Sequence, residues 1–402
     1  MSETLRAVVI GAGWAGEGHT RALQYLGVDV VAICARRPEV VRAAADRLGV
    51  RAASTDWRQT LETVRPDVVA LATPAALRTE PIEVAAKLGC HVYSEKPLAT
   101  NAGEASRLYH LVTQAGIKHA LAATHRYDPS VVWMAELLRE GAIGRLLEGE
   151  FANRLSFSPL RPWSWADTVA TGGLFASPLP HVFAILETLT GSPLGAVAGS
   201  MRPGRTRAPV VPEVTNYGDV GKLTPTAEEA ERLEWRACDV EAGVAALLRF
   251  GPSPAGTAEG GATPPTPGEA VTVSFAGSVD APATWPGSGI RLYGTQGTLV
   301  GQGYGSYTVS RIASGRADAQ REALSVPQRL VEALPQVGDP LYNKWAALAR
   351  DFLADIRGEP HQPYLTFHDG WRYQEAIDAL RAGKGWHELP SALDTPAGRT
   401  AA

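Results

Sequence analysis

Two charged residues, Glu95 and Lys96, stand directly before a proline in the stretch HVYSEKPLAT, residues 91–100, where a short apolar run ends. The pattern of residues 91–95 predicts a β-strand with the lysine just past its carboxyl end. The carboxyl ends of parallel strands open onto the ligand crevice, and a desolvated lysine there can polarise a carbonyl oxygen. A surface lysine at a strand end is the alternative, and this stretch alone favours neither.

The stretch GAGWAG spaces Gly11, Gly13 and Gly16 as G-x-G-x-x-G between an apolar run and a helical pattern. In such a turn the first glycine permits the tight bend, the second lets a pyrophosphate approach the backbone, and the third lets helix and strand pack closely. The helix N-terminus then faces the phosphates. We therefore predict a dinucleotide site rather than a merely structural turn, with Trp14 and Ala15 among its contacts.

The second predicted strand ends in ICARRPE, with Ala35, Arg36 and Arg37 where an acidic residue would normally bind the adenosine ribose hydroxyls. Arginine always carries its charge, and its planar fork matches phosphate geometry. The stretch therefore favours NADP(H), with its 2'-phosphate, and NAD(H) is the alternative cofactor. A second interpretation treats both arginines as solvated charges at the entry to a helix.

The elements that must position these residues follow a regular order. Through residue 124 the chain alternates helical stretches with short apolar strands, which are LRAVVI, VDVVAIC, DVVALAT, HVYSE and KHALAAT. This rhythm predicts an α/β fold for residues 1–124, an NAD(P)-binding Rossmann domain with a doubly wound parallel sheet. Pro38 and Gly49 mark the start and the end of one of its helices.

After residue 124 one helix is followed by longer strands with alternating polar and apolar residues, as in RLLEGEFANRLSF, GVAALLRF and AVTVSFAGSV. Alternation suits a sheet with one covered face. Residues 125–390 are therefore predicted to form an α+β domain with a large, mostly antiparallel open sheet, for substrate binding and oligomerisation. Residues 251–268 and 391–402 hold few core-forming side chains, and we expect a flexible loop insertion and a frayed tail there.

The composition and net charge indicate which kinds of binding partner to expect. The 402 residues are 45% hydrophobic and 20% charged, which is typical of a globular protein long enough for two domains. The formal net charge is −4 and the basic residues are scattered, which disfavours nucleic acid and membrane surfaces and favours a small molecule. Because neither a secretory signal nor a run of about 18 apolar residues is seen, we expect a cytoplasmic protein.

The cysteines and histidines give no metal signal. Cys34, Cys90 and Cys238 are far apart and form no CxxC pair, and no HExxH motif or clustered His and Asp set has ligand spacing. We therefore expect reduced thiols and no metal site.

With these motifs the sequence resembles the glucose-fructose oxidoreductase, inositol dehydrogenase and rhizopine-catabolism family, Gfo/Idh/MocA. The resemblance covers most of residues 5–390 in family order, through GAGWAGEGH, ATPAALR, HVYSEKPLAT, HRYDP, REGAIGRLLEGEF, GGLFASPLPH, IRLYGTQGTLVG and FHDGWRYQEAIDAL. It implies an NAD(P)-dependent oxidoreductase in which Lys96 lies beside the nicotinamide and hydrogen-bonds the substrate oxygen. Glu95 would orient that lysine or the nicotinamide ribose, and Pro97 would fix the turn, through a cis bond in relatives. His19 matches a family histidine, for which we favour a hydrogen-bonded structural role.

Other family positions extend the expected site. Thr73 and Pro74 of ATPAALR should line the cofactor, while Arg78 stands where relatives often carry histidine. Arg126 and Tyr127 of HRYDP open the second domain near the nicotinamide, where they would contact the ligands or only brace the hinge.

One position departs from the family pattern. The family usually carries an aspartate four residues before a histidine, whereas this chain keeps His181 but has Ser177. An aspartate would raise the pKa of the imidazole and orient it, and serine can only relay a proton or hydrogen-bond a sugar hydroxyl. We hypothesise that His181 is the general acid/base, with Lys96 as oxygen anchor, and a helix-capping histidine is the alternative. Trp163 and Trp165 precede this block and could stack on a sugar ring or pack in the core.

The predicted function is an NADP(H)-dependent oxidoreductase that moves a hydride between nicotinamide and a carbonyl or secondary alcohol of a sugar, nucleotide-sugar or cyclitol. A reductase of a non-sugar ketone or imine is one alternative, which the missing aspartate favours. A non-catalytic dinucleotide-binding sensor is another. An open sheet face usually finds a partner, so a homodimer or homotetramer is expected.

Overall fold

The computed structural model describes residues 4–175, 177–214, 217–251, 270–281, 287–313 and 321–391. The predicted loop insertion, except for Gly251, and the predicted tail, except for Ser391, lie outside the described residues.

The first part of the chain forms a parallel sheet with the strand order β3-β2-β1-β4-β5-β6. Its strands are β1 (Arg6–Ile10), β2 (Asp29–Cys34), β3 (Ala52–Ser54), β4 (Val68–Leu71), β5 (His91–Ser94) and β6 (His119–Leu121). The helices between them are α1 (Trp14–Tyr25), α2 (Pro38–Leu48), α3 (Trp57–Val64), the short 3-10 helix η1 (Ala75–Leu77), α4 (Thr79–Leu88) and α5 (Ala102–Gln114). The strand order reverses between β1 and β4, and ligands bind at such a switch point. The predicted Rossmann fold is confirmed.

Local sequence explains these elements. Strand β4 is buried along its whole length, as a central strand covered on both faces requires. Pro38 occupies the first turn of α2, and Gly49 ends that helix in the left-handed conformation, as predicted. Asp56 and Asn101 cap α3 and α5 by accepting a backbone N–H each.

The second sheet runs, within the described residues, in the order β16-β15-β14-β13-β7-β12-β11-β8-β17. The strands are β7 (Leu146–Arg154), β8 (Leu194–Pro203), β11 (Glu241–Phe250), β12 (Val271–Ser278), β13 (Gly289–Gly294), β14 (Gly297–Gly303), β15 (Tyr307–Ala313), β16 (Arg321–Leu324) and β17 (His387–Glu388). Neighbours are antiparallel except for the parallel pair of β7 and β12. A separate small ribbon pairs β9 (Arg207–Pro209) with β10 (Trp235–Ala237). The predicted mostly antiparallel α+β architecture is confirmed.

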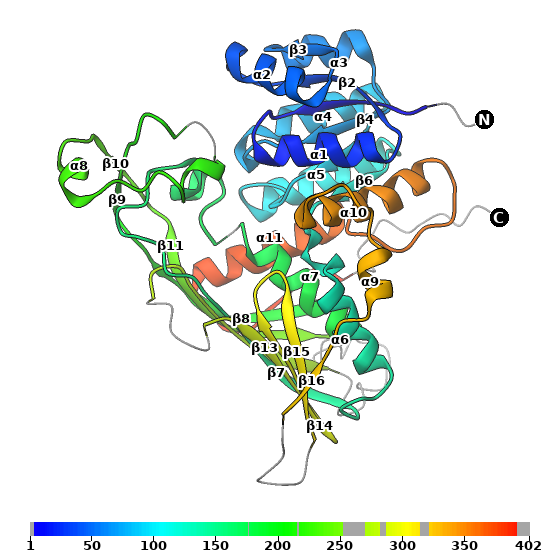
Figure 1. Cartoon of the computed structure of the whole chain (residues 1–402), viewed down its shortest axis with the longest axis vertical. Helices are drawn as coiled ribbons and strands as arrows, with labels where there is room; N and C mark the ends of the chain where they lie inside the picture. The colour runs from blue at the N-terminus through cyan, green and yellow to red at the C-terminus, as the bar shows by residue number, and fades with distance from the viewer. Residues whose placement is uncertain are drawn as a thin grey trace, which may run out of the picture.

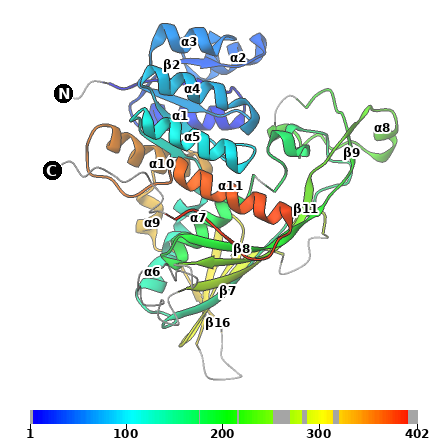
Figure 2. The same ribbon diagram turned by 180° about the vertical axis from the view of Figure 1, so that it is seen from behind.

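Helices cover the face of this sheet that looks toward the Rossmann domain, as Figures 1 and 2 show. The covering helices are α6 (Pro129–Arg139), α7 (Leu179–Thr190) and α11 (Phe367–Ala382), and the 3-10 turn η2 (Thr124–Tyr127) directly precedes α6. Two short helices, α8 (Ala227–Glu231) and α9 (Gln328–Glu332), lie at the periphery. The short 3-10 turns η3 (Trp165–Asp167), η4 (Val169–Thr171) and η5 (Tyr217–Asp219) complete the elements. Burial alternates along β11, where Val244, Ala246 and Leu248 are buried and Leu247 is exposed. The sheet therefore has one covered face, as its alternation predicted.

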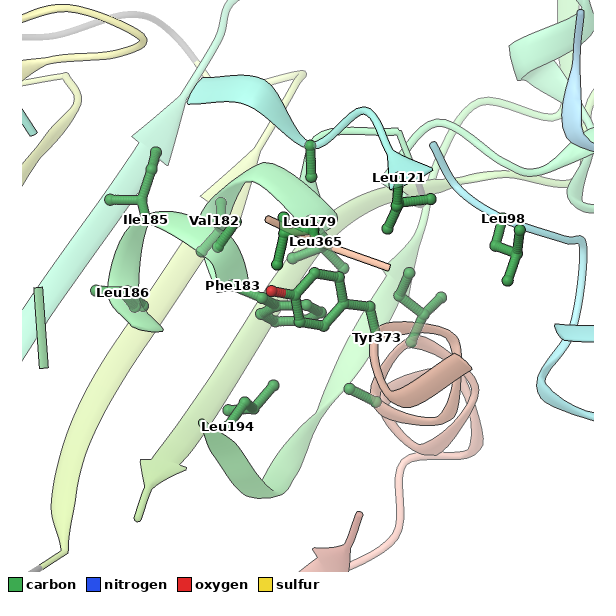
Figure 3. Close-up of a cluster of buried hydrophobic side chains, with 14 of the residues drawn as sticks. Leu98, Leu121, Leu179, Val182, Phe183, Ile185, Leu186, Leu194, Leu365 and Tyr373 are labelled. Carbon is green, nitrogen blue, oxygen red and sulfur yellow. The ribbon is translucent and has the colours of Figure 1, made fainter. Parts of the chain in front are cut away.

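Helix α7 is apolar nearly all round and is fixed in the core between the two sheets. Figure 3 shows Phe183 of this helix against the ring of Tyr373 of α11, with Val182 and Leu186 in the same buried cluster. The Phe183 and Tyr373 ring centroids are 5.4 Å apart. Burial of this kind holds the first turn of α7 at a fixed place beside the Rossmann domain.

Helix α10 (Pro340–Ile356) returns to the Rossmann domain and packs against α1. Trp345, Leu348 and Phe352 belong to the same buried cluster as Val9 and Leu23. The proposed division of the chain at residue 124 thus leaves a helix of the second segment in the core of the first. Helical periodicity alone does not reveal against which sheet a helix will pack.

Candidate active site

A cavity of about 900 Å³ lies between the carboxyl ends of the Rossmann strands and the second domain. The Rossmann side of its lining comes from the glycine turn, from the residues after β2 and β4, and from Glu95 and Lys96 after β5. We call the part contributed by residues beyond 124 the substrate end. It is lined by His125, Leu155, Phe157, Trp165, Leu174, Ser177, Pro178, His181, Tyr217, Val279 and Tyr304.

The glycine turn can pack this tightly against its own backbone only because Gly11 and Gly16 lack side chains. Gly11 has a φ of +118°, and a Cβ there would lie 2.7 Å from the carbonyl oxygen of Ala72. A Cβ on Gly16 would lie 1.8 Å from the carbonyl oxygen of Gly11. Gly13 precedes α1 in an extended conformation and lines the cavity with Trp14 and Ala15. The geometry fits a dinucleotide pyrophosphate at the N-terminus of α1.

The residues that follow β2 close one end of the cavity. Ala35, Arg36 and Arg37 all line it, and both arginine side chains are exposed there. The structure therefore brings these three predicted residues to the same cavity as the glycine turn. Thr55 and Trp57, which the sequence reasoning did not single out, line this end as well.

Arg78 joins the turns after β4 and β5. Its buried guanidinium donates to the carbonyl oxygens of Thr73, Glu95 and Pro97. Burial lowers its pKa to about 10, although the charge of Glu95 opposes that shift. Thr73 and Pro74 line the cavity, and the peptide bond before Pro97 is cis. Arg78 thus fixes both turns.

Lys96 reaches across the domain boundary. Its Nζ donates to the main-chain carbonyl oxygen and to Oγ of Ser177, each at 2.9 Å. Burial lowers the pKa of the lysine below its ordinary value, the charge of Glu95 opposes the shift, and that of Arg78 adds to it. A positively charged amine with a lowered pKa at the carboxyl edge of the sheet can both polarise a carbonyl and transfer a proton.

Glu95 is held in place by a hydrogen bond with His19, which therefore has the structural role that we favoured. Nε2 of His19 lies 3.0 Å from Oε1 of Glu95, and the buried imidazole stacks on Tyr93. Burial raises the pKa of the Glu95 carboxyl, but the hydrogen bond and charge of His19 and the charges of Lys96 and Arg78 outweigh it, so the pKa lies below its usual range. Glu95 therefore supplies a fixed negative charge behind Lys96.

Two histidines stack at the substrate end. The rings of His181, on the first turn of α7, and His125, on η2, have centroids 3.9 Å apart and planes inclined by 14°. Burial lowers the pKa of His125 to about 3, with Lys344 and Lys96 adding to the shift. Burial likewise holds the pKa of His181 well below its usual range, and the charges of His125 and Lys96 lower it further. Both imidazoles are uncharged near neutral pH.

Sequence reasoning missed His125, although it stands in the quoted block HRYDP after a predicted strand. Its position at the carboxyl end of β6 was the signal that could have found it. Within the described residues, Nδ1 of His125 and Nδ1 of His181 are buried without a hydrogen-bond partner. Both histidines also line the cavity.

Other predicted residues do not line the cavity. Trp163 donates from Nε1 to the carbonyl oxygen of Ala237, 3.3 Å away, and Arg236 lies over its ring. Tyr127 packs against the Rossmann core and Arg126 lies over its ring, 5.9 Å from the centroid. Gly16 acts through helix and strand packing. Trp165, in contrast, lines the cavity beside Tyr217.

The described residues contain neither a metal-ligand cluster nor a membrane-spanning helix. Among the described residues, no group of three or more His, Cys, Asp or Glu side chains could hold a metal ion. No helix within the same ranges is long and apolar enough to cross a bilayer.

A glycine turn at the switch point of a parallel sheet, sharing one cavity with a partly buried lysine, defines a dinucleotide-binding Rossmann protein with a second, α+β domain. Residues 5–122 match the model of the oxidoreductase family with an NAD-binding Rossmann fold, GFO_IDH_MocA. The resemblance to the Gfo/Idh/MocA family that the sequence motifs predicted is confirmed.

Individual relatives agree with this assignment. A levoglucosan dehydrogenase from Pseudarthrobacter phenanthrenivorans is 30% identical over 220 residues, which cover 50% of this chain and 56% of that protein. The scyllo-inositol 2-dehydrogenase (NAD(+)) of Bacillus subtilis is 26% identical over 222 residues, 55% of this chain and 62% of that protein. The chain therefore matches little more than half the length of these relatives.

Solved structures match the whole fold. A levoglucosan dehydrogenase in complex with NADH and levoglucosan has a TM-score of 0.75 at 23% identity, over 97% of this chain and 100% of that one. An NAD binding oxidoreductase from Klebsiella pneumoniae has a TM-score of 0.74 at 21% identity, over 97% of this chain and 100% of that one. At these identities the likeness shows the fold.

Proposed function

We propose that this chain is an NADP(H)-dependent oxidoreductase that moves a hydride between nicotinamide and a carbonyl or secondary alcohol of a sugar or cyclitol. The observation that carries the proposal is Lys96, whose partly buried amine lies in the same cavity as the glycine turn and reaches Ser177 of the second domain. The names of the relatives, levoglucosan and inositol dehydrogenases, support the substrate class.

Bound nicotinamide would supply or accept the hydride at the substrate carbon. The side chains of the protein would orient the substrate and transfer the proton to or from its oxygen. In reduction the substrate oxygen gains a proton as its carbon gains the hydride, and in oxidation both leave. Lys96 would hold that oxygen, and Ser177 would keep the amine aimed at it.

The charge states of His181 and Lys96 indicate which of the two side chains donates the proton to the substrate oxygen. The sequence hypothesis gave the proton to His181, but an imidazole with a strongly lowered pKa is uncharged near neutral pH and has no such proton to give. The ammonium of Lys96 carries one. We therefore favour Lys96 as the acid in reduction and the base in oxidation, with His181 as a neutral hydrogen-bonding group beside the substrate.

The 2'-phosphate is assigned to the end of the cavity with Arg36 and Arg37. The double replacement of both arginines by alanine should weaken NADPH binding by about 10- to 100-fold, because charge-assisted hydrogen bonds are lost, and should leave NADH binding nearly unchanged. Fluorescence titration with each nucleotide measures this. Arg42→Ala, an exposed position on α2 that does not line the cavity, is the control. Equal losses for both nucleotides would contradict the preference for NADP(H).

The test of the whole proposal is a screen of sugars, cyclitols and ketones in which NADPH and NADH are followed separately. Turnover of any carbonyl or polyol with either nucleotide supports an oxidoreductase. Tight NADPH binding without turnover across the panel would instead favour the non-catalytic sensor. Preferred turnover of a non-sugar ketone or imine would favour the other alternative, which the serine at position 177 makes a specific candidate.

A further inference from the structure

The substrate end of the cavity is largely apolar. Its walls are formed by Leu155, Phe157, Trp165, Leu174, Tyr217 and Val279. Leu174 and Val279 are buried, and Leu155, Phe157 and Trp165 pack against the main hydrophobic core. Within the described residues, no Asp, Glu, Lys or Arg side chain from beyond residue 124 lines the cavity.

Polar groups gather at one edge only. Lys96 and Ser177 are joined by hydrogen bonds, and His125 and His181 stack with one buried nitrogen each that lacks a protein partner. The ring of Tyr304 lies 5.5 Å from that of His125. A ligand can therefore satisfy its reacting oxygen and a neighbouring hydroxyl at this edge.

The charged side chains of the second domain nearest to these walls do not line the cavity. The buried guanidinium of Arg161 lies behind the rings of Phe157 and Tyr217, with centroids 5.0 and 5.7 Å away. It is paired with Asp167, which is fully buried and also accepts from Arg205 at 2.8 Å. The two guanidiniums share one carboxylate, and none of these three side chains lines the cavity.

A substrate with hydroxyls or charges all round would leave several of them unpaired against the apolar walls, which is unfavourable. We propose that the enzyme acts on an uncharged hydroxylated ring that carries an apolar substituent, such as an alkyl or aryl glycoside, with the substituent against the walls around Phe157 and Trp165. This inference rests on the proposed function and narrows it, because free cyclitols, sugar phosphates and nucleotide-sugars lack such a group or carry charge.

A homologous series tests the inference. Affinity for methyl, butyl, hexyl and octyl glucosides in the NADPH complex, measured by calorimetry, should rise with chain length. The rise should approach but not exceed about fourfold per methylene, the limit for full burial of that group. Myo-inositol, glucose 6-phosphate and glucuronate should bind more weakly than the hexyl glucoside. A flat series, or tighter binding of a charged sugar, would overturn the inference.

A matched pair of leucines locates the effect. Leu155 lines the cavity just beyond β7, whereas Leu147 lies exposed on the same strand and away from the cavity. Leu155→Asn should flatten the dependence on chain length and leave NADPH affinity near wild type. Leu147→Asn should keep the full dependence. An unchanged slope in Leu155→Asn would contradict the placement of the substituent.

The two proposals fail in different ways. Binding is read without catalysis, so glycosides that bind in the expected order but are never turned over would refute the oxidoreductase and leave the ligand class standing. Turnover of sugars or cyclitols without any gain from an apolar substituent would refute the ligand class alone.

Discussion

The charge at Lys96 is set by burial, by the adjacent Glu95 and by Arg78 from the preceding turn. Burial and Arg78 lower its pKa, while Glu95, itself held by His19, opposes the shift. The amine is therefore more acidic than an exposed lysine and still has a compensating carboxylate nearby. This balance suits a group that must give and regain a proton within each catalytic cycle.

Replacement of that amine tests its role directly. Lys96→Met should lower kcat by about 100- to 1,000-fold, the usual loss when one donor to a reacting oxygen is removed. NADPH affinity should change little, because other residues form the glycine turn. Initial rates and nucleotide titration measure both quantities. Lys87→Met, at an exposed position in the last turn of α4, is the control. A Lys96→Met enzyme with wild-type kcat would refute the assignment.

The pH dependence should have opposite signs in the two directions. Reduction needs the protonated amine, so its kcat should fall as pH rises through the lowered pKa of Lys96. Oxidation needs the neutral amine, so its kcat should rise through the same pKa, which lies below the ordinary value of 10.5. Rate profiles from pH 5 to 10 measure both. An inflection near pH 6 that disappears in His181→Gln would instead restore the histidine as proton donor.

At the scale of elements, the site depends on helices that pack unusually closely. Helix α1, which presents its N-terminus to the dinucleotide, lies against α10 at Gly18, where a Cβ would be 2.0 Å from the ring of Trp345. Trp345 in turn contacts Trp14 at the edge of the cavity, with ring centroids 5.1 Å apart. Helix α10 therefore supports the cofactor end of the cavity.

A pair of glycine replacements tests this packing. Gly18→Ala should destabilise the protein by about 1–3 kcal/mol, because the buried Trp345 ring must shift. Gly103→Ala, on α5, meets only the tip of Asn101 at 3.5 Å and should stabilise by about 0.5–1 kcal/mol through helix propensity. Urea denaturation of both variants gives the comparison. Equal stabilities would show that α1 and α10 can separate at little cost.

At the scale of the whole molecule, a buried ion pair ties three regions together. Nζ of Lys344, on α10, donates to Asp128 at 3.0 Å and to the carbonyl oxygen of Gly305 at 2.9 Å. Asp128 caps α6, and Gly305 packs against the ring of His125. Lys344 therefore joins helix α10 to the start of α6, through Asp128, and to the loop that holds Gly305 beside the substrate end of the cavity.

Removal of this buried amine should be costly. Lys344→Met leaves the carboxylate of Asp128 buried without its partner, and a loss of about 3–5 kcal/mol in the free energy of unfolding is expected. Lys118→Met breaks an exposed pair with Asp355 and should cost less than about 1 kcal/mol. Thermal or urea denaturation of the two variants distinguishes these sizes. A small loss in Lys344→Met would mean that the three regions hold together by apolar packing alone.

Much of the fold could be predicted because it depends on local patterns. The strand and helix rhythm of the first 124 residues, the G-x-G-x-x-G turn and the cap residues Pro38 and Gly49 each act over a few neighbouring residues. The alternation along β11 likewise predicted a sheet with one covered face. These features follow from backbone geometry and burial that adjacent side chains impose.

What the sequence determined by itself was therefore the type of fold, the place of the dinucleotide turn and the lysine that faces the cavity. Only the tertiary structure brought Ser177 to Lys96 across 81 positions of the chain, stacked His125 on His181, and turned Trp163 away while keeping Trp165 at the cavity. It also decided which apolar residues line the substrate end. Such contacts depend on how separate sheets and helices pack against each other, and no periodicity within a single segment encodes that packing.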